Sequence, residues 1–554
     1  MKKLLCALAA CTMLCGCTAA PAQTNPAQTT LPPESVSTGD FETKWADSGF
    51  VRIALDDAMP AVTLPEGMDE NAVTIANDII YYEEGHDESY GEGEKGEAHS
   101  AEEAARHTVV HINAPGTYVL TGKLSAGQIA VDLGEDAEND PAAVVNLILD
   151  GVDITNTVAP AVIFYNVYEC GDTDSPSATV DTSAAGANVI LAEGSRNYVN
   201  GSHVAKIYKP GTDKKLHKYD AAFYSKMSMN VDGEGELHIT ADNEGLDSEL
   251  HLTVGGGTIN IASGNDGINT NEDGVSVTTV NGGHLRIHVT GETGEGDGID
   301  SNGWLVINGG IVEAMACPAS MDSGIDSDMG IHINGGTVIA TGNMLDRIED
   351  GSQTHAVFTF ASRQQPGTYT LKNAAGETVL EVAAENAFQN LILSSPELTG
   401  GTYTLWSGSI QFQGVAGSSG GFFGEMQPID RPERPGGGGD VEIPPQPTQP
   451  IVTHGDQPAP DMSVQGQPPA IPEMPEDMPV PQFPEGSEGQ MPNAQFPEGG
   501  EGNMPMPQLP EGVEPPQDGF GRQPIGNVQI VGTLSTDFPL TSGANYFTNV
   551  RPVE

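Results

Sequence analysis

A pair of adjacent glycines recurs along the middle of the chain at a nearly constant spacing, and this repeat limits the folds that the chain can adopt. Short runs rich in Val, Ile and Thr separate the pairs, and no long stretch has the apolar period of a helix. A repeat of this length with two or three short strands is typical of a solenoid. The pairs lie at Gly256-Gly257, Gly282-Gly283, Gly309-Gly310 and Gly335-Gly336, in steps of 26, 27 and 26 residues.

Among the solenoids, a parallel β-helix fits the repeat best. A propeller blade would need a longer repeat, and a leucine-rich repeat would show a regular Leu and Asn pattern, which is absent. In a β-helix each coil stacks on the previous one at about 4.8 Å, and glycines occupy its tight corners. We therefore predict an all-β chain in which residues 108–350 form a parallel β-helix. The predicted inward residues include Leu246, Ile268, Ile299 and Ile325.

Each repeat also carries an acidic turn, and the four turns align on one glycine. The residues two positions after that glycine are Asp247, Asn269, Asp300 and Asp326, and those just before it are Glu244, Asp266, Asp297 and Ser323. Equivalent positions of a stacked solenoid form columns. Two columns of mostly acidic side chains are therefore expected to flank one corner of the coils.

Such columns are costly without compensation. Unit charges about 5 Å apart repel by about 1 kcal/mol in water and about 3 kcal/mol at an effective dielectric of 20. Between Val231 and Asp350, 21 Asp and Glu residues face only Arg286 and Arg347, so ion pairs cannot neutralise them. Raised carboxyl pKa values are one remedy, and a bound cation is the other. Carboxylates and turn carbonyls suit Ca²⁺, whereas metal-free turns built from Asp and Asn are the alternative.

Two other residue types raise questions of function. Trp304 follows the third acidic turn, and two interpretations are open, an exposed platform for sugar binding or a contact within the core or at a coil end. Cys170 and Cys317 are the two cysteines outside the first 17 residues. A bridge between them is possible, but two buried, inert thiols are the favoured interpretation.

The first residues indicate export. Residues 1–17 combine Lys2 and Lys3 with a short apolar run, which is typical of a signal peptide and too short to span a bilayer. The run ends in Leu-Cys-Gly-Cys, which resembles a bacterial lipobox, so we expect acylation of Cys17. Ordinary cleavage near Ala19-Ala20 is the alternative. A lipid on Cys17 would anchor the protein to the membrane on its extracytoplasmic side, at the cell surface.

Composition divides the rest of the chain. Residues 18–45 are predicted to be a flexible tether, and 46–107 an N-terminal segment with an acidic loop. After the helix, 351–415 is predicted to form a small C-terminal β module. The Pro, Gly and Glu-rich tract 416–523 is predicted to be a long disordered insertion, with 524–554 a terminal β segment that pairs with the module.

Several motifs, in order, make residues 105–410 similar to a known bacterial family. They include APGTYVLTGKLSAGQIAVD, VVNLILDGVDIT, ANVILAEGSRNYV and SSPELTGGTYTLWSG, together with the acidic repeats. The chain resembles the carbohydrate-binding family of right-handed parallel β-helices, which have a polysaccharide-lyase-like fold and bind cellulose and pectic acid. The resemblance implies a right-handed helix with Ca²⁺ along its acidic turns. By position, the implied ligands are Asp247, Asp266, Asn269, Asp297, Asp300 and Asp326.

The predicted function is non-catalytic, calcium-dependent binding of a cellulose- or pectin-like polysaccharide at the cell surface. Nucleic acid is excluded, because a net charge of -55 repels phosphates. One alternative is a pectate lyase or polygalacturonase-like enzyme on the same fold. A lyase needs a basic residue beside Ca²⁺, for which the core repeats offer only Arg286. The other alternative is a structural or adhesion protein that binds a protein partner.

Overall fold

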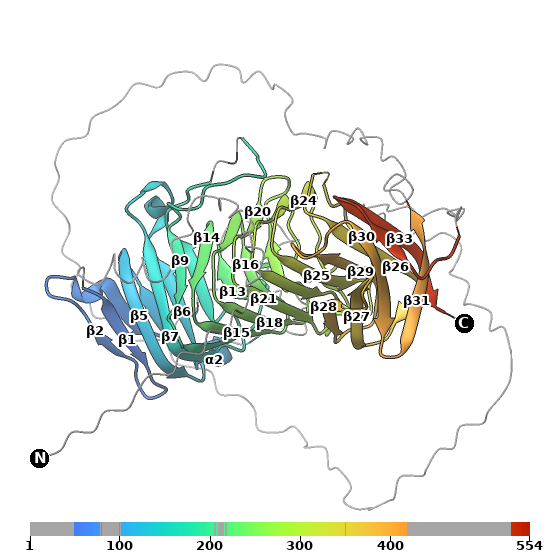
Figure 1. Cartoon of the computed structure of the whole chain (residues 1–554). Helices are drawn as coiled ribbons and strands as arrows, with labels where there is room; N and C mark the ends of the chain where they lie inside the picture. The colour runs from blue at the N-terminus through green and yellow to red at the C-terminus, as the bar shows by residue number, and fades with distance from the viewer. Residues whose placement is uncertain are drawn as a thin grey trace, which may run out of the picture. The chain divides into compact units, whose positions relative to one another are not determined.

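The computed structural model describes residues 49–417 and 533–553, except for 78, 80–98, 100, 172, 174, 204–206, 209–214, 217–218 and 350. The predicted signal peptide, the acylation residue Cys17, the tether, the acidic loop of segment 46–107 and nearly all of the tract 416–523 lie outside these residues. The described chain is mostly β (Figure 1). Within it, no helix has the length and apolar character needed to cross a membrane.

Parallel strands dominate the fold and form three stacks, in which each strand pairs with its counterpart from the next repeat (Figure 1). The first stack contains β4 (Thr108–Ile112), β6 (Gly127–Asp132), β8 (Val162–Asn166), β13 (Ala221–Ser225), β16 (Glu244–Ser248) and β19 (Ile268–Thr270). The second contains β9 (Ala187–Leu191), β14 (Met229–Gly233), β17 (His251–Val254), β20 (Val277–Val280), β22 (Trp304–Ile307) and β24 (Gly330–Ile333). The third contains β10 (Arg196–Gly201), β15 (Glu236–Ala241), β18 (Thr258–Ser263), β21 (His284–Val289), β23 (Ile311–Met315) and β25 (Thr337–Gly342).

One repeat thus contributes one strand to each stack, as β16, β17 and β18 do in succession. The long strands β5 (Gly116–Leu124) and β7 (Val145–Thr155) pair with each other, and β7 spans two stacks because it pairs with both β9 and β10. This long parallel arrangement is consistent with the predicted β-helix. The predicted inward side chains Leu246, Ile268, Ile299 and Ile325 are all fully buried in one apolar cluster.

The repeated glycines form the corners between the second and third stacks. The second glycine of each pair has a positive φ, for example 78° at Gly283 and 76° at Gly310. A Cβ at Gly283 would lie 2.7 Å from the carbonyl oxygen of Gly257 in the preceding coil. Only glycine satisfies both demands, the backbone conformation and the close approach of the coils.

Shorter elements extend the N-terminal side. Strand β1 (Val51–Leu55) pairs in parallel with β5 and antiparallel with β2 (Ala61–Thr63). Strand β3 (Val73–Ala76) pairs antiparallel with β4. The remaining elements here are the 3-10 helices η1 (Glu70–Ala72) and η3 (Glu135–Asn139), helix α2 (Ala101–Ala104), and the hairpin of β11 (Ile207–Tyr208) and β12 (Lys215–Leu216).

Antiparallel strands follow the last repeat and enclose a second, aromatic-rich core. They are β26 (His355–Gln364), β27 (Gly367–Asn373), β28 (Thr378–Ala384), β29 (Phe388–Ser394), β30 (Gly401–Ser407) and β31 (Ile410–Gly417). The chain end joins them, because β32 (Phe538–Leu540) pairs with β30, and β33 (Ala544–Pro552) pairs with β26 and β31. Strand β29 also pairs with β25, so the aromatic core closes the end of the third stack.

Candidate metal centres

The acidic turns are brought into register by backbone pairing along the first stack. Asp247 on β16 lies opposite Asn269 on β19. Beyond β19 the stack continues, because Ile268 forms a parallel bridge with Ile299 and Gly298 donates its N–H to the carbonyl of Ser323. Side chains from successive coils therefore meet at one side of the molecule.

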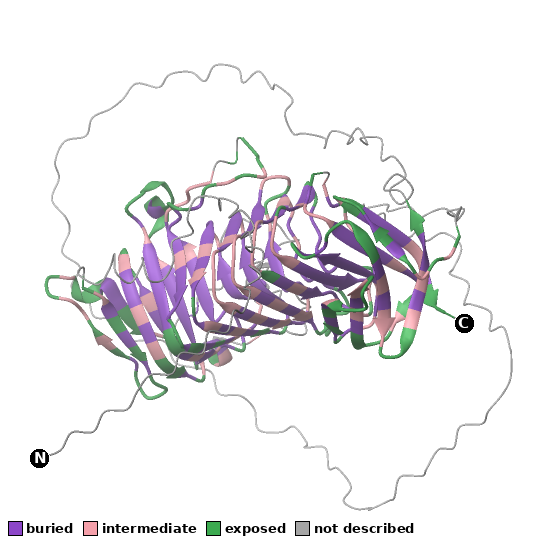
Figure 2. Ribbon diagram, viewed as in Figure 1, coloured by how far each residue is buried: buried purple, intermediate pink, exposed green. Residues whose placement is uncertain are grey.

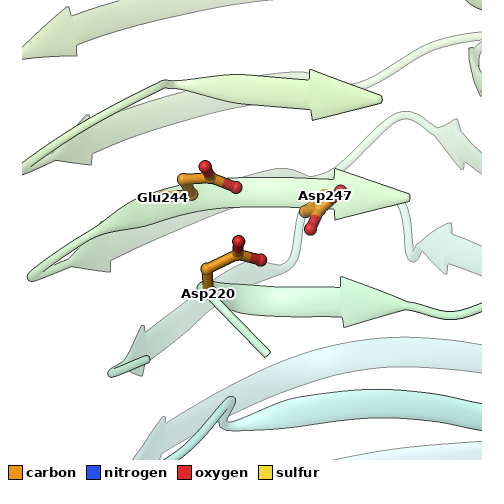
Figure 3. Close-up of side chains that lie close together, drawn as sticks. All are labelled: Asp220, Glu244 and Asp247. Carbon is orange, nitrogen blue, oxygen red and sulfur yellow. The ribbon is translucent and has the colours of Figure 1, made fainter. Parts of the chain in front are cut away.

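Three carboxylates gather at one end of this row, which we call the first acidic cluster: Asp220, Glu244 and Asp247 (Figure 3). Glu244 and Asp247 are the first and fourth residues of β16, and Asp220 immediately precedes β13 on the preceding coil. One oxygen from each carboxylate lies within 4.8 Å of the others. Their exposed fractions are only 1%, 5% and 0%, so water does little to screen them.

Burial is the main reason why the pKa of Asp247 is raised well above its ordinary value, and the charges of Asp220 and Glu244 raise it further. Three ionised carboxylates this close in a buried site are unstable by themselves. The cluster must therefore retain protons or hold a cation.

Two amide side chains complete the first acidic cluster. Asn269 Nδ2 donates to Glu244 Oε1 at 3.2 Å, and Asn271 Nδ2 donates to both oxygens of Asp247 at 3.1 and 3.0 Å. Within the described residues, Oδ1 of each asparagine is buried and accepts no hydrogen bond. Asn269 itself is only 6% exposed. A buried amide oxygen without a donor is costly, and it is also a ligand of the kind that hard cations prefer.

A second acidic cluster lies two coils further along and consists of Asp297, Asp300 and Asp326. Asp326 is buried, whereas the other two are half-buried. Burial, followed by the charges of Asp326 and Asp300, raises the pKa of Asp297 well above its ordinary value. Asp266 lies beside this cluster, with its pKa raised by burial and then by Asp297 and Asp300, and its Oδ1 accepts the backbone N–H of Asp297 at 2.6 Å.

The six residues chosen from sequence thus divide between two clusters. Asp247 belongs to the first, with Asn269 beside it, and Asp297, Asp300 and Asp326 form the second, with Asp266 beside it. Sequence reasoning missed two carboxylates of the first cluster. Glu244 was already in the column of residues that precede the aligned glycine. Asp220 comes before the regular repeats, and only the strand register reveals its position.

The other candidate residues lie elsewhere. Trp304 begins β22 in the second stack, where it is half-buried between Val277 and Gly330 of the neighbouring strands. Cys170 and Cys317 are both free thiols. Cys317 is buried as expected, but Cys170 is only partly buried, because it lies in the irregular segment after β8. Burial is nevertheless the main cause that raises the pKa of Cys170 to about 12, which disfavours the reactive thiolate form.

Arg286, the basic residue considered for lyase chemistry, lies apart from the acidic clusters. Arg286 lies on β21 in the third stack, and its guanidinium pairs with the carboxylate of Glu385. A lyase base must instead approach the substrate carbon beside the metal. Arg286 is thus on a different stack from both acidic clusters, and Arg347, the other arginine of the repeats, pairs with Glu349.

Comparisons with known proteins find similarity to proteins named for a carbohydrate-binding domain. A protein from Acetivibrio thermocellus named as a carbohydrate-binding domain-containing protein is 29% identical over 153 residues, which is 27% of this chain and 44% of that protein. The chain thus spans less than half the length of this curated relative. A solved structure of a polysaccharide lyase-like protein from C. thermocellum, a gadolinium derivative, aligns with 20% identity and a TM-score of 0.32, over 55% of this chain and 98% of that one. At this TM-score the likeness supports no conclusion about the present chain. Residues 106–364, which contain both acidic clusters, match the family model of carbohydrate-binding domain-containing proteins.

Proposed function

We propose that the protein is a non-catalytic, calcium-dependent polysaccharide-binding protein, built on a right-handed parallel β-helix and held at the cell surface by a lipid on Cys17. Two observations support it, the family match over residues 106–364 and the buried acidic clusters within that range. The first acidic cluster supports the proposed calcium dependence, because it combines three buried carboxylates with the buried Oδ1 of Asn269. The lipid anchor and location rest on the first 17 residues of the sequence.

Calcium is the proposed ion because of the chemistry of the ligands. Ca²⁺ takes six to eight oxygen ligands in flexible geometry, including carboxylates, amide oxygens and backbone carbonyls. The first acidic cluster supplies carboxylate and amide oxygens in a Gly-rich turn. Mg²⁺ would demand near-octahedral geometry and usually retains several waters, which a buried site accommodates poorly.

The proposed role of the ion in the first acidic cluster is to link coils. Glu244 and Asn269 lie on the neighbouring strands β16 and β19 of the first stack, and Asp220 immediately precedes β13, which pairs with β16. An ion shared among them would tie three coils together and remove the repulsion between their carboxylates. Glycan binding would then depend on calcium because the coils need it to stay ordered.

An enzyme on the same fold is less well supported. Among the described residues, Arg286, the basic residue considered for a lyase, is paired with Glu385 and lies on a different stack from both clusters. The raised pKa values of the clustered aspartates are explained by burial and mutual repulsion. Pairs of carboxylates alone do not identify a hydrolase, since stacked acidic turns produce them at every coil.

The test is native affinity electrophoresis of the full chain in gels that contain a soluble cellulose derivative, polygalacturonate or a mucin-type glycan. Each gel is run with Ca²⁺ and with chelator. The proposal expects retardation by a cellulose- or pectin-like glycan that weakens in chelator, with no release of sugar fragments. Equal mobility in every gel would contradict it and would favour a protein-binding surface role.

A further inference from the structure

The outward side of the third stack presents ordered rows of polar side chains. Buried and partly exposed residues alternate along β15, β18 and β21, because the apolar side faces the core (Figure 2). The strand register aligns the outward residues across neighbouring coils. We call these residues the polar face: Arg196, Tyr198, Glu236, His238, Asn260 and Arg286.

One row of the polar face runs straight along the stack. Tyr198, His238, Asn260 and Arg286 occupy equivalent positions on four successive strands. Coils stack at about 4.8 Å, so this row offers a hydrogen-bonding group at each such step. The row is a regular, strand-supported surface that a linear ligand can follow.

An exposed aromatic residue stands at one end of this row. The Tyr198 ring stacks on the His238 ring with centroids 4.9 Å apart and an interplanar angle of 16°. Tyr198 is nevertheless 40% exposed, whereas the tyrosines of the cores are buried. The histidine covers one side of the ring, and the exposed part of Tyr198 is open to a ligand.

The charges on and around the polar face are balanced. Arg196 Nε lies 2.8 Å from Glu236 Oε2, and the same carboxylate oxygen is 3.2 Å from His238 Nε2. Arg286 pairs with Glu385 at the other end of the row. These pairs fix side chains that would otherwise be mobile, which lowers the entropy cost of binding a ligand to them.

This balance distinguishes the polar face from the chain as a whole. On the polar face and among the residues next to it, three Lys and Arg side chains lie near four carboxylates. The whole chain, in contrast, has 22 Lys and Arg against 77 Asp and Glu. An acidic polysaccharide would find no surplus of cations here and would be repelled by the rest of the surface. The ion-paired side chains still offer donors and acceptors to hydroxyl groups. The counted residues are Lys123, Arg196, Arg286, Asp153, Glu236, Glu313 and Glu385.

We propose that the polar face is the glycan-binding surface and that its ligand is a neutral, hydroxyl-rich linear polysaccharide lying along the row from Tyr198 to Arg286. This inference rests on the proposed polysaccharide-binding function and adds the surface and the class of glycan. The acidic clusters lie on the first stack, so the ion and the glycan occupy different surfaces. Sugar hydroxyls bind directly to side chains of the third stack.

The experiment measures binding of hydroxyethyl cellulose and of polygalacturonate to the full chain in Ca²⁺, by affinity electrophoresis. The test variants are Tyr198→Ala and, two strands further along the row, Asn260→Ala. The control is Trp406→Ala, which removes a half-buried aromatic side chain from β30, outside the three stacks. Thermal melting of each variant checks that it folds, and either test variant suffices if the other does not.

The proposal expects the unmodified chain to bind hydroxyethyl cellulose and not polygalacturonate. Each test variant should bind about tenfold more weakly, as expected for the loss of one or two good hydrogen bonds, and the control should bind as the unmodified chain does. Unchanged binding by folded test variants would overturn the polar face while leaving the proposed function intact. Binding of polygalacturonate alone would overturn the neutral ligand. Failure of the unmodified chain to bind any glycan would overturn the proposed function itself.

Discussion

Replacement of Asp247 by Asn removes one charge from the first acidic cluster with little change in shape. At 4.8 Å, two ionised carboxylates repel by about 3 kcal/mol at an effective dielectric of 20. Without an ion, burial and then this repulsion raise the pKa of Asp247. A group whose pKa is higher in the folded state costs stability as pH rises through that value. In chelator at pH 7, Asp247→Asn should therefore melt at the same temperature as the unmodified chain or higher.

In calcium the sign reverses. An ion at 100 times its dissociation constant stabilises the folded state by about 2.7 kcal/mol. For large domains, 1 kcal/mol corresponds to about 2–4 °C in melting temperature, so calcium should raise that of the unmodified chain by roughly 5–10 °C. Asp247→Asn loses one of the three carboxylates, and we expect at least half of this rise to disappear.

The assay is differential scanning calorimetry in calcium and in chelator, with Asp150→Asn as the matched control. Asp150 is an exposed residue on β7, outside both acidic clusters. The control should keep the full calcium-dependent rise. If Asp247→Asn lowered the melting temperature equally in calcium and chelator, Asp247 would be a structural residue and not an ion ligand.

Three further predictions concern other parts of the chain. Burial lowers the pKa of His251 to about 4, so its neutral form stabilises the fold above pH 6.5. This stability should be lost as pH falls toward 4, by up to about 3 kcal/mol. Denaturation of His251→Asn across this pH range should not show that loss. Gly283→Ala should destabilise the fold by about 1–3 kcal/mol in urea denaturation, because φ at Gly283 is 78° and a Cβ there would clash with the preceding coil. Gly376 has a φ of 81° but open space around it, so Gly376→Ala should destabilise the fold less. Cys17→Ala should release the protein from membranes in cell fractionation, and continued membrane association would contradict the lipid anchor.

The period of the glycine pairs carried most of the fold information. Stacked coils must repeat the same corner, so the chain repeats the residue that such a corner requires, as at Gly283 and Gly310. The same logic predicted the buried column that contains Ile268 and Ile299. The spacing is regular because a shift of one residue would expose a whole apolar column. A regular spacing is in turn easy to recognise in a sequence.

What the sequence could not reveal depends on strand register. Asp220 joins the first acidic cluster although it lies before the regular repeats, and its neighbour Ala221 pairs with Glu244 only once β13 is placed beside β16. The row from Tyr198 to Arg286 cannot be recognised in the sequence either, because its first and last members are 88 residues apart along the chain (286 minus 198). Interruptions between β8 and β13 remove the period there, so spacing alone cannot align these strands.

The most direct test of the calcium account is isothermal titration of Ca²⁺ into the full chain after chelator treatment. Two acidic clusters predict saturable binding of about two ions, one of which disappears in Asp247→Asn while the other remains. Absence of saturable binding by the unmodified chain, or the same binding in the variant, would contradict the account and leave the clustered carboxylates protonated.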